Sequence, residues 1–249
     1  MEFLQPDWHE QLESTNATLI QWIAEGQRIP EGYVLATYDQ TAGRGRMDRK
    51  WVAPAGKNLT FSYVAKMPMD QSTATSIAMA VALAVVDYLE SIDIRAQTKW
   101  PNDVWVGDRK ICGILTETCE NRVAPGRSLI VGIGLNVNLS KTDADNIDRP
   151  ATSILIEINE SKRVEDVLDA LLLRLAGWLS RWNDGGFESI REQWTSHCLY
   201  VNESVAIGDG EQMETGVLEG FGAHGQAKLR RDDGELVEVW AGDLSLRPK

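Results

Sequence analysis

The pattern of apolar residues changes near residue 197, and this change constrains the fold more than any other feature of the 249-residue chain. Before it, apolar side chains recur every three or four positions from Val164 to Trp182, which predicts an amphipathic helix. After Cys198, short apolar stretches alternate with turns that contain glycine and aspartate. This spacing is typical of a small β-barrel. We therefore predict two domains, residues 1–197 and residues 198–249.

The first domain combines helices and strands. Short runs rich in β-branched and aromatic residues predict strands at residues 33–37, 59–64, 96–100, 104–106, 109–116 and 129–137. Apolar residues at helical spacing predict helices from a cap at Ser14 or Thr15 to about Gly26, from a cap at Ser72 or Thr73 to Leu89, at 164–182 and at 187–196. The segment before Ser14 is short and polar, and the polar stretch from Ser140 to Asp148 is predicted to be a loop.

The composition excludes several classes of protein. The formal net charge of -12 argues against nucleic-acid binding across a broad surface. The sequence has no apolar run long enough for a transmembrane helix, and it begins without the basic and apolar segments of a signal peptide. Its three cysteines form no Cys-x-x-Cys motif, so we expect reduced thiols in a cytoplasmic protein. Its three histidines are too dispersed for a histidine-based zinc site.

One segment is locally cationic within this acidic chain. The stretch from Gly43 to Gly56 contains four basic residues within seven positions: Arg44, Arg46, Arg49 and Lys50. Glycine allows a backbone to approach a ligand closely, and arginine offers a planar fork of donors to phosphate or carboxylate oxygens. The segment is therefore a candidate binding site for a small anion. The alternative is a solvated basic turn.

A second informative segment runs from Lys99 to Glu117. Its Trp-Pro-Asn-Asp sequence predicts a tight turn that holds Asp103 near Lys99. The Gly107-Asp108 pair predicts a hairpin connection. Strict alternation along the next strand would place Lys110, Cys112 and Ile114 on one face and Gly113 on the other.

Nucleotide-binding loops of the common types are absent from the sequence. Gly56-Lys57-Asn58 lacks the remaining residues of a P-loop, and Val137 stands where a dinucleotide fingerprint needs its third glycine. Gly132 and Gly134 are better explained as positions where a ligand or helix approaches a central strand. If ATP binds, it must do so through arginine and lysine side chains.

Five motifs, taken together, resemble biotin protein ligases. In chain order they are Ser14-Thr15-Asn16, Gln40-Thr41-Ala42-Gly43-Arg44-Gly45-Arg46, Lys99-Trp100-Pro101-Asn102-Asp103, Arg109-Lys110-x-x-Gly113-Ile114-Leu115 and Gly132-Ile133-Gly134-Leu135-Asn136-Val137-Asn138. The tail from Trp240 to Arg247 also resembles the C-terminal domain of that family. One departure is Asp48, where the family usually has glycine. Only about a dozen residues precede Ser14, so we expect no N-terminal helix-turn-helix domain.

The resemblance implies an α+β fold. Its catalytic domain would be like that of class II synthetases, with helices packed on a mixed, mainly antiparallel sheet. A small SH3-like β-barrel would follow at the C-terminus. It also implies a two-step reaction, in which biotin and ATP, with Mg²⁺, give biotinyl-5′-AMP, and biotin then passes to a lysine of the biotin carboxyl carrier protein of acetyl-CoA carboxylase. We expect a monomer or weak homodimer that binds no nucleic acid and no membrane.

The same resemblance assigns roles to individual residues. The catalytic set is Lys110, Arg46 and Asp103. Biotin would contact Ser14, Thr15, Asn16, Gln40, Gly43, Arg44, Gly45, Arg46, Lys110, Gly113, Gly132 and Gly134. ATP would contact Arg44, Arg46, Arg49, Trp51, Lys99, Asn102, Lys110 and Asn136. Asp103 has two open roles: it would hold Mg²⁺ through water, or accept the proton of the incoming lysine.

Three other functions compete with this interpretation. Lipoate–protein ligases share the expected catalytic fold, but Ser14-Thr15-Asn16 and the Gln-x-x-Gly-Arg-Gly-Arg sequence favour biotin. A non-enzymatic biotin-binding protein would not need Lys110, Asp103 and all three loop arginines. A nucleic-acid module on the C-terminal strands is disfavoured, because the basic run from Lys228 to Arg231 lacks interleaved aromatic residues.

Overall fold

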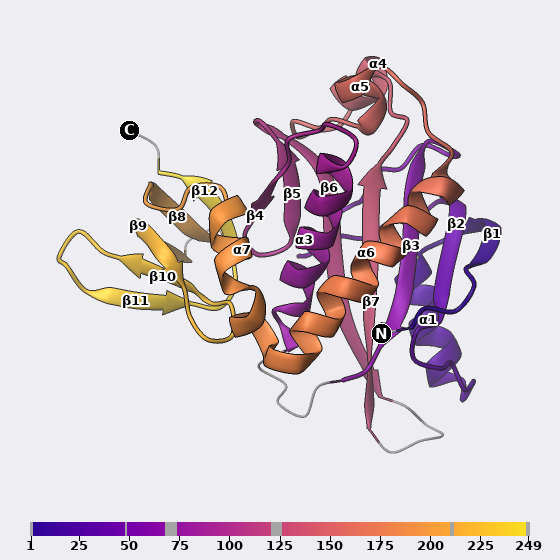
Figure 1. The fold of residues 1–249 in the computed structure, drawn as a ribbon, viewed down its shortest axis with the longest axis horizontal. Helices are drawn as coiled ribbons and strands as arrows, with labels where there is room; N and C mark the ends of the chain where they lie inside the picture. Colours follow the sequence, from indigo (N-terminus) through magenta and orange to yellow (C-terminus); the bar gives the residue numbers. More distant parts are fainter. Residues whose placement is uncertain (1, 48, 68–73, 121–125, 210–211, 248–249) are drawn as a thin grey trace.

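The computed structural model describes the whole chain except residues 1, 48, 68–73, 121–125, 210–211 and 248–249 (Figure 1). Its larger sheet has seven strands in the order β1-β2-β3-β7-β6-β5-β4. Among the described strands of this sheet, β1 and β2 pair in parallel and the other neighbours are antiparallel. The strands are β1 (Asp7–Leu12), β2 (Val34–Gln40), β3 (Asn58–Ala65), β4 (Gln97–Lys99), β5 (Asp103–Val106), β6 (Arg109–Glu120) and β7 (Arg127–Asn136).

Alternation along β7 gives the sheet two different faces. The odd-numbered positions of residues 129–135 are buried in the main hydrophobic core. Helices α3 (Ile77–Glu90) and α6 (Val164–Gly185) pack over this face (Figure 1). The even-numbered positions, which include Gly132 and Gly134, point to the opposite face. The two helices that the sequence predicts here are confirmed, and their alanine and leucine residues form the core. The cap predicted at Ser72 or Thr73 lies outside the described residues.

Helix α1 (Thr15–Ala24) covers part of the opposite face. Ser14 is its N-cap, and the Ser14 side chain accepts a hydrogen bond from the amide of Ala17. Leu19 and Ile23 of α1 pack on Ile130 of β7 in a second, smaller apolar cluster. Beyond the helix N-terminus the sheet face is free for the functional site.

One prediction for this domain is wrong in detail, and one strand was not predicted. The short, polar N-terminal segment forms strand β1 at the edge of the sheet. The predicted loop contains a short helix, α4 (Lys141–Asp145), and is followed by α5 (Ile154–Ile158). Ser140 and Asp143 form a reciprocal capping box that starts α4. Its Ser-x-x-Asp signal is visible in the sequence.

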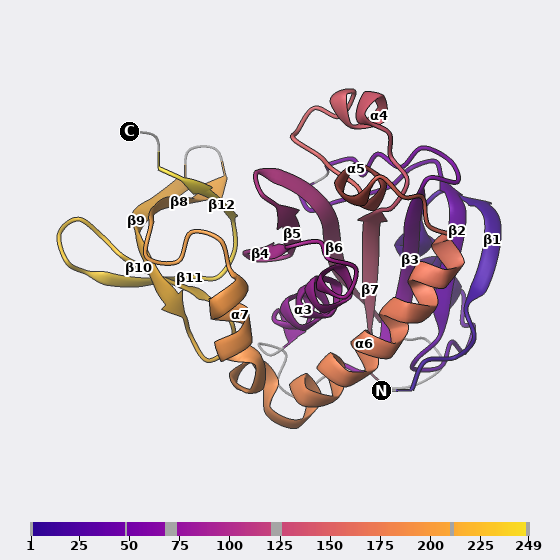
Figure 2. The same ribbon diagram turned by 45° about the horizontal axis from the view of Figure 1, so that its top comes forward.

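The C-terminal region forms a second, five-stranded antiparallel sheet, ordered β11-β10-β9-β8-β12. It follows η1 (Gly186–Ile190) and α7 (Arg191–His197), which lie between α6 and this sheet (Figure 2). The described residues show no pairing between β11 and β12, so closure into an SH3-like barrel stays a prediction. The strands are β8 (Ser204–Asp209), β9 (Gln212–Phe221), β10 (Ala227–Arg230), β11 (Leu236–Val239) and β12 (Asp243–Leu246).

The two sheets share one apolar core. Phe221 of β9 makes edge-to-face contacts with Phe187 and Trp194, with ring centroids 6.2 Å and 6.0 Å apart. Because the core is continuous, the domain boundary at residues 197 and 198 stays a prediction. Among the described residues, no helix has the length and apolar character needed to cross a membrane.

Candidate active site

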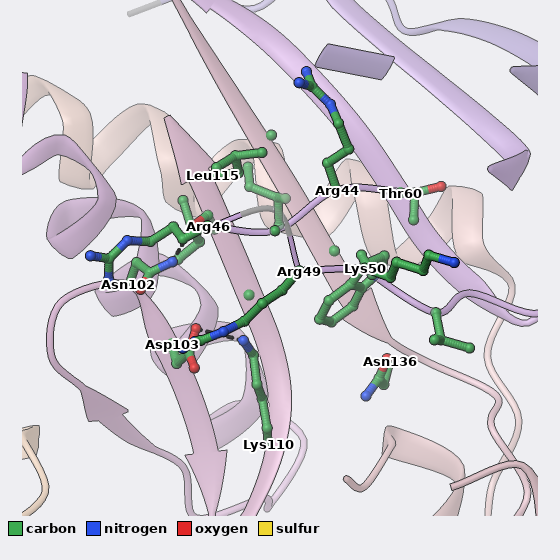
Figure 3. Close-up of a pocket in the computed structure, with 18 of the residues that line it drawn as sticks. Arg44, Arg46, Arg49, Lys50, Thr60, Asn102, Asp103, Lys110, Leu115 and Asn136 are labelled. Carbon is green, nitrogen blue, oxygen red and sulfur yellow. Dashed lines mark hydrogen bonds and ion pairs between the residues drawn. The ribbon is translucent and has the colours of Figure 1, made fainter. Parts of the chain in front are cut away.

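A cavity of about 440 Å³ lies on the sheet face that α1 leaves uncovered. The arginine loop, Gly43–Trp51 without residue 48, covers it, and Figure 3 shows the side chains that converge there. Most residues that the sequence predicts for the site line this cavity: Ser14, Thr15, Asn16, Gln40, Arg44, Gly45, Arg46, Arg49, Trp51, Asn102, Asp103, Lys110, Gly113, Gly132, Gly134 and Asn136.

One end of the cavity is a network of neutral polar groups. Gln40 Oε1 accepts hydrogen bonds from the backbone amide of Thr15 at 3.0 Å and from its hydroxyl at 3.3 Å. The buried Ser62 hydroxyl lies 2.6 Å from both Thr15 Oγ1 and Asn16 Oδ1. Since a hydroxyl has one hydrogen, Ser62 can donate to only one of them at a time. These groups can therefore exchange partners when a polar ligand enters.

Glycine makes the floor of the cavity. Ser62 and Gly132 are register partners on β3 and β7, and Thr60 pairs with Gly134. A Cβ atom on Gly132 would lie 2.3 Å from Asn16 Oδ1, and one on Gly134 would lie 2.4 Å from the indole of Trp51. The floor thus admits Asn16 and Trp51 only because both positions lack a side chain.

A β-bulge corrects the predicted orientation of Lys110. Residues Lys110 and Cys112 pair with consecutive residues of β5, so Ile111 is the extra residue and alternation is interrupted. Lys110 consequently shares a face with Gly113, while Cys112 is buried in the core. The expectation that Lys110 and Cys112 share a face is wrong.

The bulge also brings opposite charges together. Lys110 Nζ lies 2.7 Å from Asp103 Oδ1, and both side chains are about three-quarters buried. The ammonium also lies 5.6 Å from the centroid of the Trp51 ring. The sequence predicts Asp103 beside Lys99, and the two are indeed register partners on β5 and β4. The ion pair of Asp103, however, is with Lys110.

The arginine loop is closed by its own backbone. The amide of Trp51 donates to Gly43 O at 2.9 Å, and the amide of Gly45 donates to Arg49 O at 2.7 Å. A Cβ atom on Gly43 would lie 2.4 Å from Trp51 O, so glycine permits this close approach. These bonds fix the two ends of the loop next to each other above the cavity.

The loop arginines have different partners. Arg46 donates to Asn102 Oδ1 at 3.1 Å, and burial lowers the pKa of its guanidinium. Arg49 forms an ion pair with Asp243 of β12, and Arg149 lies 4.0 Å from the same carboxylate. The C-terminal sheet therefore contributes Asp243 to the cavity, a contribution that the sequence did not indicate. Asp48, the departure from the family pattern, lies outside the described residues.

The matching family accounts for this arrangement. A model described as "Biotin/lipoate A/B protein ligase family" matches residues 8–136, and the bifunctional ligase/repressor BirA of Bacillus subtilis is 32% identical over 251 residues, covering 96% of this chain and 73% of that protein. This chain belongs to the biotin/lipoate A/B protein ligase family.

Further members of the biotin/lipoate ligase family agree in length and fold. The biotin--[acetyl-CoA-carboxylase] ligase of Paracoccus denitrificans is 32% identical over 232 residues, covering 90% of this chain and 94% of that enzyme. The Aquifex aeolicus biotin protein ligase, solved in complex with biotin and ATP, is 28% identical. It superposes with a TM-score of 0.82 and covers 99% of this chain and 100% of the other.

Two residues of the predicted ligase site do not line the cavity. Gly43 lies at the base of the loop. Lys99 Nζ lies 4.0 Å from the centroid of the Trp105 ring, and burial lowers its pKa. Asn136 does line the cavity, but its amide is already engaged with Asn58 and with Thr152 O. A contact of Lys99 or Asn136 with ATP stays a prediction.

Sequence reasoning missed several residues around the ligase cavity. They are Thr60 and Ser62 of β3 and Ala151 before α5, besides Asp243. Residues 147–150 also line the cavity; they end the loop of residues 139–150, for which the sequence leaves two interpretations open, closure over the adenine side or an inert surface loop. The part of the chain that the structure describes contains no group of three His, Cys, Asp or Glu residues able to hold a metal ion by itself.

Proposed function

We propose that this protein is a biotin protein ligase, which activates biotin with ATP and transfers it to a lysine of a biotin carboxyl carrier domain. The observation that supports this best is the distribution of polarity along one cavity. Neutral polar groups lie at one end, glycine forms the middle, and Arg46, Arg49 and Lys110 lie at the other end. Biotin joined to a nucleotide phosphate has chemical groups in the matching order: a polar ureido ring, an apolar chain and an anion.

The ring end matches the hydrogen-bonding needs of a ureido group. The ring offers two N–H donors and one carbonyl acceptor, which require short polar partners in a closed pocket. Ser14, Thr15, Asn16 and Gln40 supply these partners. The dithiolane ring of lipoate lacks N–H groups, so the same set would leave buried polar atoms without partners. This argues for biotin over lipoate.

The cationic end fits the first chemical step. A carboxylate oxygen of biotin attacks the α-phosphorus of ATP, and pyrophosphate leaves. Both reactants are anions, so their repulsion must be offset. Lys110 and Arg46 are placed to neutralise charge on the carboxylate and the α-phosphate as it develops in the transition state.

Asp103 fits three roles in the two-step reaction. Its ion pair with Lys110 fixes the position of the ammonium. Its second carboxylate oxygen would hold Mg²⁺ through water, in keeping with an ion that binds through one or two carboxylates and substrate phosphates. In the second step the carrier lysine attacks the acyl carbon and AMP leaves, and Asp103 would accept the proton from that amine.

The reaction itself provides the test. We expect the purified protein to exchange radiolabelled pyrophosphate into ATP only when biotin is present, and to label a purified biotin carboxyl carrier domain. Exchange that depends on lipoate instead of biotin would indicate a lipoate–protein ligase. Binding of biotin without any exchange would indicate a non-enzymatic biotin-binding protein. The carrier partner, the cytoplasmic location and the monomer or weak dimer stay predictions.

A further inference from the structure

The side-chain amide of Asn16 makes more hydrogen bonds within the protein than contact with a ligand alone would require. It lies near the start of α1 and is 3% exposed. Its amide nitrogen donates to Glu117 Oε2 at 2.8 Å and to Leu115 O at 3.3 Å. Both amide hydrogens are therefore in use, so only Oδ1, which lies 2.6 Å from the Ser62 hydroxyl, is available to accept from a ring N–H.

Glu117 connects this amide to the arginine loop. Alternation along β6 places it on the cavity face beyond Gly113 and Leu115, but it does not line the cavity. Its Oε2 accepts from Arg44 Nη2 at 2.9 Å as well as from Asn16. One carboxylate oxygen thus bridges the ring pocket and the first loop arginine.

The direction of Arg44 supports a role different from that of the other loop arginines. Figure 3 shows Arg44 extending away from the group formed by Arg46, Arg49, Asp103 and Lys110. Its guanidinium ends at Glu117, whose side chain is 25% exposed, rather than among the groups suited to phosphate. Arg44 therefore acts as an anchor of the loop.

We infer that Glu117 is a positioning residue that couples occupation of the ring pocket to the order of the arginine loop; this rests on the proposed function. Biotin bound to Asn16 favours the arrangement in which Glu117 holds Arg44. ATP bound under the loop favours the same arrangement. Two ligands that stabilise one arrangement tighten each other's binding, because the second no longer has to order it.

The test is the ratio of two biotin affinities. Biotin is titrated calorimetrically into the protein alone and with saturating α,β-methylene-ATP, which cannot release pyrophosphate. We expect the analogue to tighten biotin binding in the parent. The ratio of the biotin affinity with the analogue to the biotin affinity without it measures this tightening. In Glu117→Gln the ratio should fall about two- to fivefold, as expected for the loss of one partly exposed, charge-assisted pair. Because the readout is a ratio, a uniform change in ATP affinity cancels.

Two further variants isolate the effect. The glutamine side chain in Glu117→Gln keeps an acceptor for Asn16, so biotin affinity without nucleotide should change less than the ratio. Glu120→Gln removes a carboxylate from the exposed end of the same strand and should keep the parent ratio. Adding Arg44→Gln to Glu117→Gln should lower the ratio no further, since the pair is already broken.

Each result has a clear interpretation. Absence of biotin-dependent pyrophosphate exchange in the parent would overturn the proposed function. An active parent with an unchanged ratio in Glu117→Gln would overturn only the coupling role. An equal loss in Glu120→Gln would also overturn it, since the effect would then reflect net charge.

Discussion

Gly132→Ala tests whether the ring pocket depends on the close approach of Asn16 to the sheet. A Cβ atom at this position would lie 2.3 Å from Asn16 Oδ1, 2.9 Å from its Cγ and 3.2 Å from its Nδ2. Ordinary contact would require Asn16 to move by about 1 Å. Such a shift breaks the hydrogen bonds of 2.6 Å to Ser62 and 2.8 Å to Glu117.

The size of the effect follows from these contacts. Overpacking of a buried site costs about 1–3 kcal/mol of unfolding free energy. Loss of hydrogen bonds that include a charged partner costs about 1.5–3 kcal/mol. These costs divide between the free protein and its complex with biotin. We expect the share that destabilises only the complex to weaken biotin binding about 10- to 100-fold. Calorimetric titration with biotin and chemical denaturation measure the two effects separately.

Two other glycines are matched controls. Gly134→Ala presses on the Trp51 indole instead of Asn16, so it should affect biotin binding alone less than Gly132→Ala. Gly177 lies in α6 with open space at its Cβ position, so Gly177→Ala should stabilise the protein by about 0.5–1 kcal/mol and leave biotin binding unchanged. A folded Gly132→Ala protein with the biotin affinity of the parent would refute this account of the ring pocket.

Two further predictions concern the charged groups. Lys110→Ala and Arg46→Ala should each lower biotin-dependent pyrophosphate exchange about 100-fold with folding intact, and near-normal exchange would exclude a catalytic role. Hydrogen bonds from Lys57 and Ser140 lower the pKa of Asp143 to about 2. The ionised carboxylate therefore stabilises the folded protein above the ordinary aspartate pKa of 3.8, and this stabilisation is lost as pH falls toward 2. Asp143→Asn should therefore lower the unfolding free energy by about 1 kcal/mol at pH 7, a difference that shrinks below pH 4 in denaturation curves; a constant difference would contradict it.

The elements that the sequence predicts well carry local signals. Helix α6 has apolar residues at helical spacing over its whole length, and the β5–β6 hairpin has Gly107-Asp108 at its turn. Strand β1 was missed because its polar residues show no buried face and its pairing with β2 is non-local. The bulge at Ile111 was missed for the same reason, because it depends on the register between two strands.

The candidate site shows the same division between features with a local sequence signal and features that depend on non-local pairing. Motif residues far apart in the chain do meet in one cavity, because β3, β6 and β7 are neighbours. Ser62 and Glu117 were missed, although both alternate with residues of predicted strands. Their position at the site can be predicted only when the strand order and register are known. Asp243 belongs to the other sheet, so no local pattern could connect it to Arg49.

Asp243 also bears on how an acidic chain holds an anionic nucleotide. With a net charge of -12, the whole protein repels ATP at long range, so attraction must come from groups within a Debye length. Arg46, Arg49 and Lys110 would repel one another if left unpaired, and Asp103 and Asp243 offset this repulsion in the free protein. Under the proposed function, the phosphates take over the partners that these carboxylates hold. Binding then exchanges the ion pairs of Arg49 and Lys110 for contacts with phosphate, while Arg46, which donates to the neutral Asn102 in the free protein, gains an anionic partner.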